Sequence, residues 1–258
     1  MRLWWNEQYP AKGQATNLCK SLYLVFMNTR KKIVVLSGAG VSAESGIPTF
    51  RASDGLWENH RIEDVATPEA WVRNPTLVQD FYNQRRKQAL TVQPNAGHLA
   101  LVKLEEKYDV TVITQNVDNL HERAGSSTVI HLHGELFKSR SSVDESLIYD
   151  IDGWELKAGD LCKKGSQLRP HIVWFGEAVP MMDVALDITD QADIFIVVGT
   201  SLNVYPAASL VYAVRRGVPI YVVDPNIPSM QKRPNVTFIA EPATSGLTQL
   251  AEQLSAQA

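Results

Sequence analysis

The chain has 258 residues, of which 45% are hydrophobic, so it is long and apolar enough to bury a sizeable core. Its net charge of −3 excludes the positive field that nucleic-acid binding requires, and no apolar run approaches the roughly 18 residues of a membrane span. Two cysteines, Cys19 and Cys162, cannot form a disulfide framework and indicate a reducing compartment. We therefore expect a soluble cytoplasmic protein with no nucleic acid and no membrane as a partner.

The first 26 residues differ from the rest of the chain. Met27 stands just before the first clear strand, and the apolar stretch from Leu22 to Phe26 is too short for the core of a signal peptide. We expect residues 1–26 to be a tail outside the fold and residues 27–258 to form the folded domain.

A strand followed by a glycine turn predicts a cofactor site. Ile33 to Leu36 are strand-type residues, and Gly38-Ala39-Gly40 follows, where small side chains let the backbone approach a ligand. Ser42, Ala43 and Glu44 fit the first turn of a helix, whose N–H groups attract a pyrophosphate. Gly38, Gly40 and Ala43 match the dinucleotide fingerprint. The alternative is a turn needed only for close strand–helix packing.

The segment after this turn is a loop. An ordinary dehydrogenase has a second strand there that ends in a ribose-binding acid, whereas residues 48–60, PTFRASDGLWENH, show no apolar alternation. A long loop at this place suggests a lid over the cofactor. The stretch GAGVSAESGIPTFRASDGLW resembles the sirtuins, the NAD-dependent protein lysine deacylases.

A helix is expected from Pro75 to Leu90, after the helix-start signals Thr67-Pro68 and Asn74-Pro75. Tyr82 and Arg85, three residues apart, share one of its faces. The alternative is that Tyr82 packs in the core while Arg85, Arg86 and Lys87 form a solvated basic end. In sirtuins, Tyr-x-x-Arg at this place distinguishes the members that remove acidic acyl groups.

The next helix, from about His98 to Lys107, leads into a buried strand from Val110 to Ile113, which TQNVDNLHERAG follows. Ligands bind at the carboxyl edge of a parallel sheet, and Gln115, Asn116 and Asp118 offer short polar groups that suit a ribose or a nicotinamide amide. The alternative is a loop in which Asp118 or Asn119 caps the next helix.

A short strand from Val129 to Leu132 ends in His133-Gly134. Either His131 or His133 places an imidazole near a carboxyl edge, where it can serve as a general base for a ribose hydroxyl. A histidine in a strand is more often structural. The resemblance implies that His133 is the catalytic histidine.

The insertion after this histidine departs from the family. Most sirtuins carry two Cys-x-x-Cys pairs there that bind a structural zinc, but residues 137–170 contain Ser141 where the first cysteine is expected and Cys162 as their only cysteine. One thiolate cannot make a closed four-ligand site, so we expect no zinc. An apolar cluster between Leu147 and Leu161 should hold the insertion together instead.

A strand is expected over His171 to Glu177, and in sirtuins its FGE element lines the acyl-lysine channel. We assign substrate binding to Val173, Phe175, Gly176 and Glu177, with backbone groups available to add a peptide as an extra strand. The alternative is a core strand, with Trp174 as a packing residue.

The last part of the chain adds two βα steps. The strand from Asp193 to Val198 closes with Gly199-Thr200-Ser201, a helix from Tyr205 to Arg216 follows, and the strand from Val218 to Val223 leads to Asp224-Pro225-Asn226, where Asp224 is placed as a ribose-binding acid. A short final helix lies beyond Ala243.

The resemblance covers residues 31 to about 250 through the motifs GAGVSAESGIPTFR, TQNVDNLHERAG, HLHG, HIVWFGE and GTSLNVYP. It implies an α/β fold, a Rossmann-type parallel sheet with helices on both faces plus a small lobe from residues 60–90 and 137–170, and NAD in the cleft between them. The NAD-binding residues are then Gly38, Ala39, Gly40, Ser42, Ala43, Glu44, Pro48, Thr49, Phe50, Arg51, Trp57, Gln115, Asn116, Val117, Asp118, Gly199, Thr200, Ser201, Asp224, Pro225, Asn226 and Ala243.

The resemblance also implies the chemistry. The carbonyl oxygen of an acylated lysine on a partner protein attacks the ribose carbon that bears nicotinamide, so NAD is consumed. His133, Asn116 and Asp118 are the implied catalytic residues, and the products are nicotinamide, lysine and O-acyl-ADP-ribose. We expect removal of succinyl and malonyl groups, with some deacetylase activity. The alternatives are a mono-ADP-ribosyltransferase and a non-enzymatic NAD-sensing module.

Overall fold

The structure is a computed structural model that describes residues 30–49, 56–57, 60–230 and 233–258. The interpretation of residues 1–26 as a tail, and of Phe50 and Arg51 as lid residues, concerns positions outside these ranges. None of the helices in the described ranges combines the length and apolar character needed to cross a lipid bilayer.

The centre of the fold is a six-stranded parallel sheet with the order β11-β10-β9-β1-β4-β5. Its strands are β1 (Lys32–Ser37), β4 (Asp109–Thr114), β5 (Val129–His131), β9 (Ile194–Val198), β10 (Ile220–Val223) and β11 (Val236–Ile239). β1 lies between β4 and β9 and is buried along five of its six residues, as expected for a parallel strand covered on both faces. The predicted parallel α/β class is confirmed.

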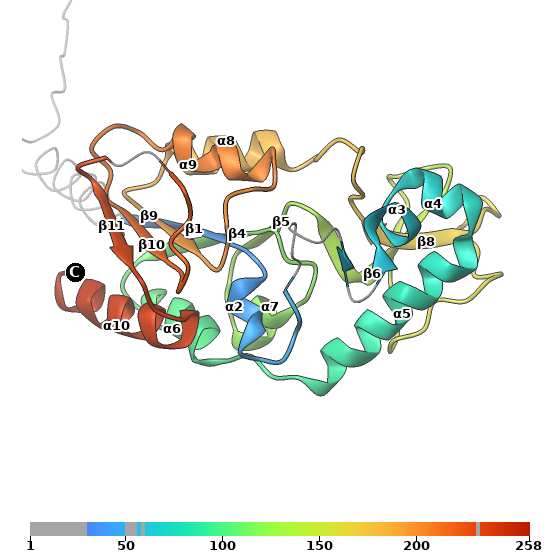
Figure 1. The fold of residues 1–258 in the computed structure, drawn as a ribbon, viewed down its shortest axis with the longest axis horizontal. Coiled ribbons are helices and arrows are strands. Elements are labelled where there is room, and N and C mark those ends of the chain that lie inside the picture. Colours follow the sequence, from blue (N-terminus) through green and yellow to red (C-terminus); the bar gives the residue numbers. More distant parts are fainter. Residues whose placement is uncertain (1–29, 50–55, 58–59, 231–232) are drawn as a thin grey trace, which may run out of the picture.

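Helices cover both faces of this sheet (Figure 1). They are α6 (Ala96–Leu104) and α10 (Ala243–Ala256) on one face, and α8 (Met182–Asp190), the short 3-10 turn η1 (Ala207–Ser209) and α9 (Leu210–Ala213) on the other. Successive side chains of β1 point to opposite faces, so Ile33 packs with Leu101 and Leu250, while Val34 packs with Ala185 and Leu210. The central strand β1 is therefore packed between two hydrophobic cores, one on each face of the sheet.

Some element predictions were wrong. The helix expected from Tyr205 to Arg216 is reduced to η1 and α9, which together span residues 207–213. Several elements, among them α8 and β11, were not predicted: β11 has only four residues and pairs with β10 at one edge of the sheet. So short a run carries little periodic signal, and only its pairing with β10 identifies it as a strand.

A second group of elements lies at the opposite end of the molecule from β11 and α10 (Figure 1). It contains an antiparallel three-stranded sheet of order β7-β6-β8 and three helices, and we call it the small lobe. Its elements are α3 (Ile62–Val65), α4 (Pro68–Arg73), α5 (Pro75–Thr91), β6 (Gly134–Ser141), β7 (Ile148–Asp150) and β8 (Leu168–Ile172). The elements outside these two groups are α2 (Gly40–Ala43), α7 (Leu120–Ala124) and the antiparallel pair β2 (Leu56–Trp57) and β3 (His60–Arg61).

A buried arginine joins α5 to the insertion. Arg86 is fully buried, and its guanidinium donates to Leu136 O at 3.1 Å, to Trp154 O at 2.7 Å and to the Asn83 side chain. Burial lowers the pKa of Arg86 to about 10, so the side chain is charged at neutral pH. The alternative that Arg86 belongs to a solvated basic end is therefore wrong, whereas its neighbour Lys87 is exposed.

We predict that Arg86→Met lowers the free energy of unfolding by about 3 kcal/mol, because two carbonyl groups and an amide oxygen lose their donor inside the protein. Urea denaturation measures this change. Lys87→Met removes the same charge from the exposed neighbouring position and should change stability by less than about 0.5 kcal/mol. Similar effects of the two substitutions would contradict the structural role of Arg86.

Candidate functional site

A cleft of about 930 Å³ lies where the carboxyl ends of the central strands meet the small lobe. Every site residue expected from the sequence lines this cleft if it falls within the described ranges; only Phe50 and Arg51 fall outside them. The fold thus brings together residues from positions 38 to 243 of the chain.

Two glycine turns form the floor of the cleft. The turn after β1 contacts the turn after β9, with Gly40 N donating to Gly199 O at 2.8 Å. A Cβ atom on Gly38 would lie 2.7 Å from Gly199 O, and one on Gly40 would lie 2.6 Å from Gly199 Cα. Gly199 has a φ of +61°, and a Cβ there would lie 2.3 Å from Val41 N. The glycines are therefore required for the close contact of the two turns, and the same residues line the cleft.

A polar cluster stands beside these turns. Asp118 is 5% exposed and accepts hydrogen bonds from Ser42 Oγ at 3.1 Å and from Leu120 N at 3.0 Å, while Asn116 Nδ2 donates to Ser42 Oγ at 3.3 Å. Burial raises the pKa of Asp118, although these hydrogen bonds oppose the shift. Asp118 therefore orders the start of α7, as the capping alternative held, and also lines the cleft. Asn119 makes no such side-chain bond.

The two histidines of the HLHG motif have different environments. His133 Nδ1 lies 3.0 Å from Gln115 O, and because a carbonyl only accepts, Nδ1 carries the hydrogen and Nε2 is the basic nitrogen of the neutral ring. Burial lowers the pKa of His133, so the ring is neutral near pH 7. His133 lines the cleft with a nitrogen able to take a proton.

His131 faces acceptors on both nitrogens, with Nδ1 2.8 Å from Asn116 O and Nε2 2.7 Å from Glu122 Oε1. Burial favours the neutral ring, but the hydrogen bond and the charge of Glu122 outweigh it, and the pKa of His131 is raised. A ring that donates through both nitrogens cannot act as a base. The structure therefore distinguishes the two histidines: only His133 has a ring nitrogen available to take a proton, and the residues of the motif alone did not show which of the two it would be.

The helix α5 presents Tyr82 and Arg85 to the cleft. Tyr82 is fully buried in the apolar cluster of the small lobe, as the core alternative held, and yet it lines the cleft. Arg85 is half-buried, and its guanidinium carbon lies 5.0 Å from the centre of the Phe81 ring. The two predicted residues thus share one wall of the cleft.

The segment from Val173 to Glu177 also lines the cleft, but it is not a strand. β8 ends at Ile172, and Gly176 has a φ of +92°. The backbone N–H groups of Val173 and Phe175 donate within the chain, to His133 O at 2.9 Å and Ala66 O at 3.0 Å. The expected seven-residue strand with N–H groups available to a peptide is therefore wrong at these positions.

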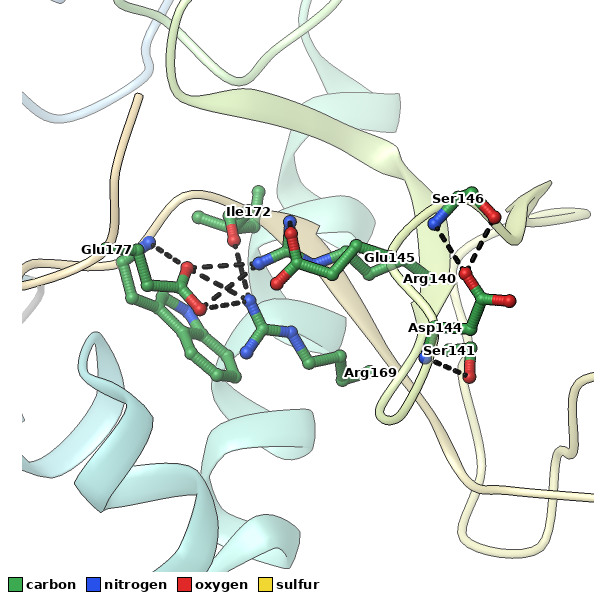
Figure 2. A network of polar contacts seen from close by, with 9 residues as sticks. Arg140, Ser141, Asp144, Glu145, Ser146, Arg169, Ile172 and Glu177 are labelled. Carbon is green, nitrogen blue, oxygen red and sulfur yellow. Dashed lines mark hydrogen bonds and ion pairs between the residues drawn. The ribbon is translucent and has the colours of Figure 1, made fainter. Parts of the chain in front are cut away.

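Glu177 takes part in a buried ion-pair cluster (Figure 2). Its carboxylate accepts from Arg140 Nη2 at 3.1 Å, from Arg169 Nη2 at 2.7 Å and from Trp174 N at 2.8 Å. Burial raises the pKa of Glu177, opposed by the bond from Trp174 N and the charge of Arg140. Glu177 therefore anchors the segment that lines the cleft, and it lines the cleft itself.

At the far end of the cleft, Asp224 accepts from Asn226 N at 2.8 Å, and burial raises its pKa. The Glu44 carboxylate accepts from Thr244 N at 3.1 Å, next to Ala243. Some lining residues were missed as site residues, although the motif GTSLNVYP contained the signal for the last four; they are Ile47, Gln88, Leu136, Trp174, Asn203, Val204, Tyr205 and Pro206.

A model of the Sir2 family matches residues 38–206 of the chain. The protein belongs to the Sir2 family. An NAD-dependent protein deacylase of Helicobacter pylori is 53% identical over 226 residues, which cover 87% of this chain and 97% of the relative. The resemblance to sirtuins is thereby confirmed.

Solved structures agree with this membership. A mutant Sir2 homologue in complex with ADP-ribose is 40% identical, with a TM-score of 0.80 over 88% of this chain and 93% of that one. A Sir2 protein with a p53 peptide and NAD+ is 31% identical, with a TM-score of 0.70 over 92% of this chain and 97% of that one. This sirtuin therefore has the Rossmann-like fold expected for it.

In the insertion where the resemblance to sirtuins would place zinc ligands, two serines and one thiol lie close together. Ser141 Oγ lies 2.9 Å from Ser166 Oγ, and Cys162 Sγ lies 3.1 Å from the same oxygen. Among the residues that the structure describes, no three His, Cys, Asp or Glu side chains are grouped so that they could hold a metal ion. The apolar residues Leu147, Leu156 and Leu168 pack around Cys162.

We predict that this sirtuin contains no stoichiometric zinc, because a single cysteine in the small lobe cannot complete a tetrahedral site. Elemental analysis of the purified protein checks this, and a chelator should leave its thermal unfolding midpoint unchanged. A four-cysteine sirtuin treated in parallel is the control. One equivalent of zinc in the purified protein would contradict the prediction.

Proposed function

We propose that this sirtuin is an NAD-dependent protein-lysine deacylase that prefers succinyl and malonyl groups and also removes acetyl groups. The observation that carries the activity is His133, a neutral imidazole with its basic nitrogen at Nε2, placed in a cleft whose floor is two glycine turns. The relative in Helicobacter pylori is named an NAD-dependent protein deacylase, which supports the general activity. Acylated lysine side chains of proteins are the proposed partners, and the small number of cysteines supports a cytoplasmic location.

The cleft fits NAD as a co-substrate. Its volume of about 930 Å³ is at the upper end of the range for small-molecule sites, and two glycine turns in close contact bring backbone rather than side chains to its floor. Asn116 and Asp118 are proposed to hold the nicotinamide and the ribose. Ser201, Asp224 and the other lining residues assigned from the sequence then face the rest of the dinucleotide, with Phe50 and Arg51 as lid residues.

The proposed reaction uses this arrangement in three steps. The acyl-lysine carbonyl oxygen attacks the ribose carbon that carries nicotinamide, and nicotinamide leaves. His133 Nε2 then takes the proton of a ribose hydroxyl, which attacks the acyl carbon, and water releases lysine and O-acyl-ADP-ribose. Mass spectrometry of the products separates this reaction from a mono-ADP-ribosyltransferase, which leaves ADP-ribose on protein, and from an NAD-sensing module, which releases no nicotinamide.

We predict that His133→Ala lowers kcat by at least about 100-fold, because it removes the general base, while NAD binding measured by calorimetry is retained. In the parent protein, acid should protonate this base only below its ordinary pKa near 6.5, since burial lowers the pKa of His133. Turnover is therefore expected to persist at pH 6.5 and to fall as the pH drops further. Near-normal turnover by the variant would contradict the assignment.

The proposed acyl preference rests on Tyr82 and Arg85. A succinyl or malonyl group brings a carboxylate into the cleft, and a buried carboxylate requires a partner. Arg85 can meet it with a guanidinium fork, and Tyr82 stands one helical turn away with a hydroxyl. Acetyl-lysine carries no such charge and makes no use of the guanidinium.

We predict that Arg85→Met lowers kcat/KM for a succinyl-lysine peptide by about 10-fold to 100-fold, the effect of losing a hydrogen bond to a charged group. The same peptide with acetyl-lysine should lose less than about threefold. Lys87→Met removes an equal charge from the same helix at a position outside the cleft and should change neither value by more than about twofold. Equal losses on both peptides would show that Arg85 supports only the fold.

A further inference from the structure

The Tyr82 hydroxyl receives a hydrogen bond that decides what it can offer a substrate. Trp174 Nε1 lies 3.1 Å from Tyr82 Oη, and both side chains are buried. An indole N–H is a donor and never an acceptor, so the Tyr82 oxygen is the acceptor of this bond. The hydrogen of the Tyr82 hydroxyl must therefore point elsewhere.

Within the described residues, no acceptor receives that hydrogen. Burial raises the pKa of Tyr82 well above its ordinary value, so the hydroxyl keeps its hydrogen across the physiological pH range. A buried donor without an acceptor is costly, and Tyr82 lines the cleft together with Arg85. A ligand acceptor in the cleft is the group that would satisfy the hydroxyl.

The orientation of Trp174 is set by its contacts with the ion-pair cluster of Glu177, Arg140 and Arg169. The Arg169 guanidinium carbon lies 3.8 Å from the centre of the indole ring, and Arg169 is itself bound by Glu177. The Trp174 backbone N–H donates to the same carboxylate at 2.8 Å. Arg140, on β6, completes the cluster. Both the ring and the main chain of Trp174 are thus held, and the indole N–H is aimed at Tyr82.

We propose that Trp174 is a positioning residue for acyl selection. Its indole N–H donates to the Tyr82 oxygen, so the Tyr82 O–H is turned toward the cleft, where it donates a hydrogen bond to the carboxylate of an acidic acyl group. This inference rests on the proposed preference for succinyl and malonyl groups. Acetyl-lysine has no carboxylate for this donor, so Trp174 affects the acidic substrates selectively.

The test removes the indole N–H. In Trp174→Phe, and in a protein with benzothienylalanine in place of Trp174, which keeps the shape of the ring but has no N–H, kcat/KM for a succinyl-lysine peptide should fall about fivefold to tenfold. Most of the fall should appear in KM, because the carboxylate contact exists in the bound substrate as well as in the transition state. The acetyl-lysine peptide should change by less than about twofold.

A double-mutant cycle with Tyr82→Phe separates positioning from packing. If Trp174 acts through the Tyr82 hydroxyl, substitution at Trp174 should cause no further selective loss in the Tyr82→Phe protein. Trp71→Phe is the matched control, since Trp71 packs in the same apolar cluster with its ring 6.0 Å from that of Trp174, and it should keep the succinyl to acetyl ratio of the parent.

The outcomes distinguish this inference from the function on which it rests. A parent protein with no preference for succinyl over acetyl peptide would overturn the acyl preference and this inference together. A parent that shows the preference and loses it in Arg85→Met, but keeps it in both Trp174 variants, would overturn this inference alone. Additive selective losses in the cycle would also overturn it.

Discussion

The close contact of two backbone turns is the constraint on which the cofactor side of this protein depends. β1 and β9 are adjacent parallel strands, so their carboxyl ends emerge side by side, and the turns that follow have no room for side chains at Gly38, Gly40 or Gly199. A Cβ at Gly199 would meet backbone at 2.3 Å, which no rotamer change can relieve. Because backbone rather than side chain forms the floor, a bound group can approach the main chain there closely.

Buried charges organise the other side of the cleft. Arg86 joins α5 to carbonyls of the insertion, and Glu177 joins the lining segment to β6 and β8 through Arg140 and Arg169. Buried ion pairs add little net stability, because desolvation offsets much of their attraction. Their effect is on geometry: each charge has only a few arrangements that satisfy it. The lining segment and α5 are therefore held in one relative position.

Local patterns in the sequence were enough to predict the parallel sheet, the glycine turns and the group of residues around His133. Each of these depends on a short run of residues in a strand or directly after one. Interactions between distant residues were not predictable. The strand expected to reach Glu177 stops at Ile172 while Glu177 binds Arg140, 37 residues earlier, and Arg86 is buried by carbonyls 50 and 68 residues away. The two histidines of HLHG were separated only by their hydrogen-bond partners.

The residues proposed to bind NAD and those proposed to select the acyl group come from separate parts of the chain. The glycine turns belong to β1 and β9, whereas Tyr82 and Arg85 belong to α5, which is anchored through its own buried contacts. Under the roles proposed above, a change of two side chains on one helix could alter the acyl group accepted while the machinery that consumes NAD is left intact. Such an arrangement lets a lineage diversify its substrates by point substitution, without rebuilding the catalytic centre each time.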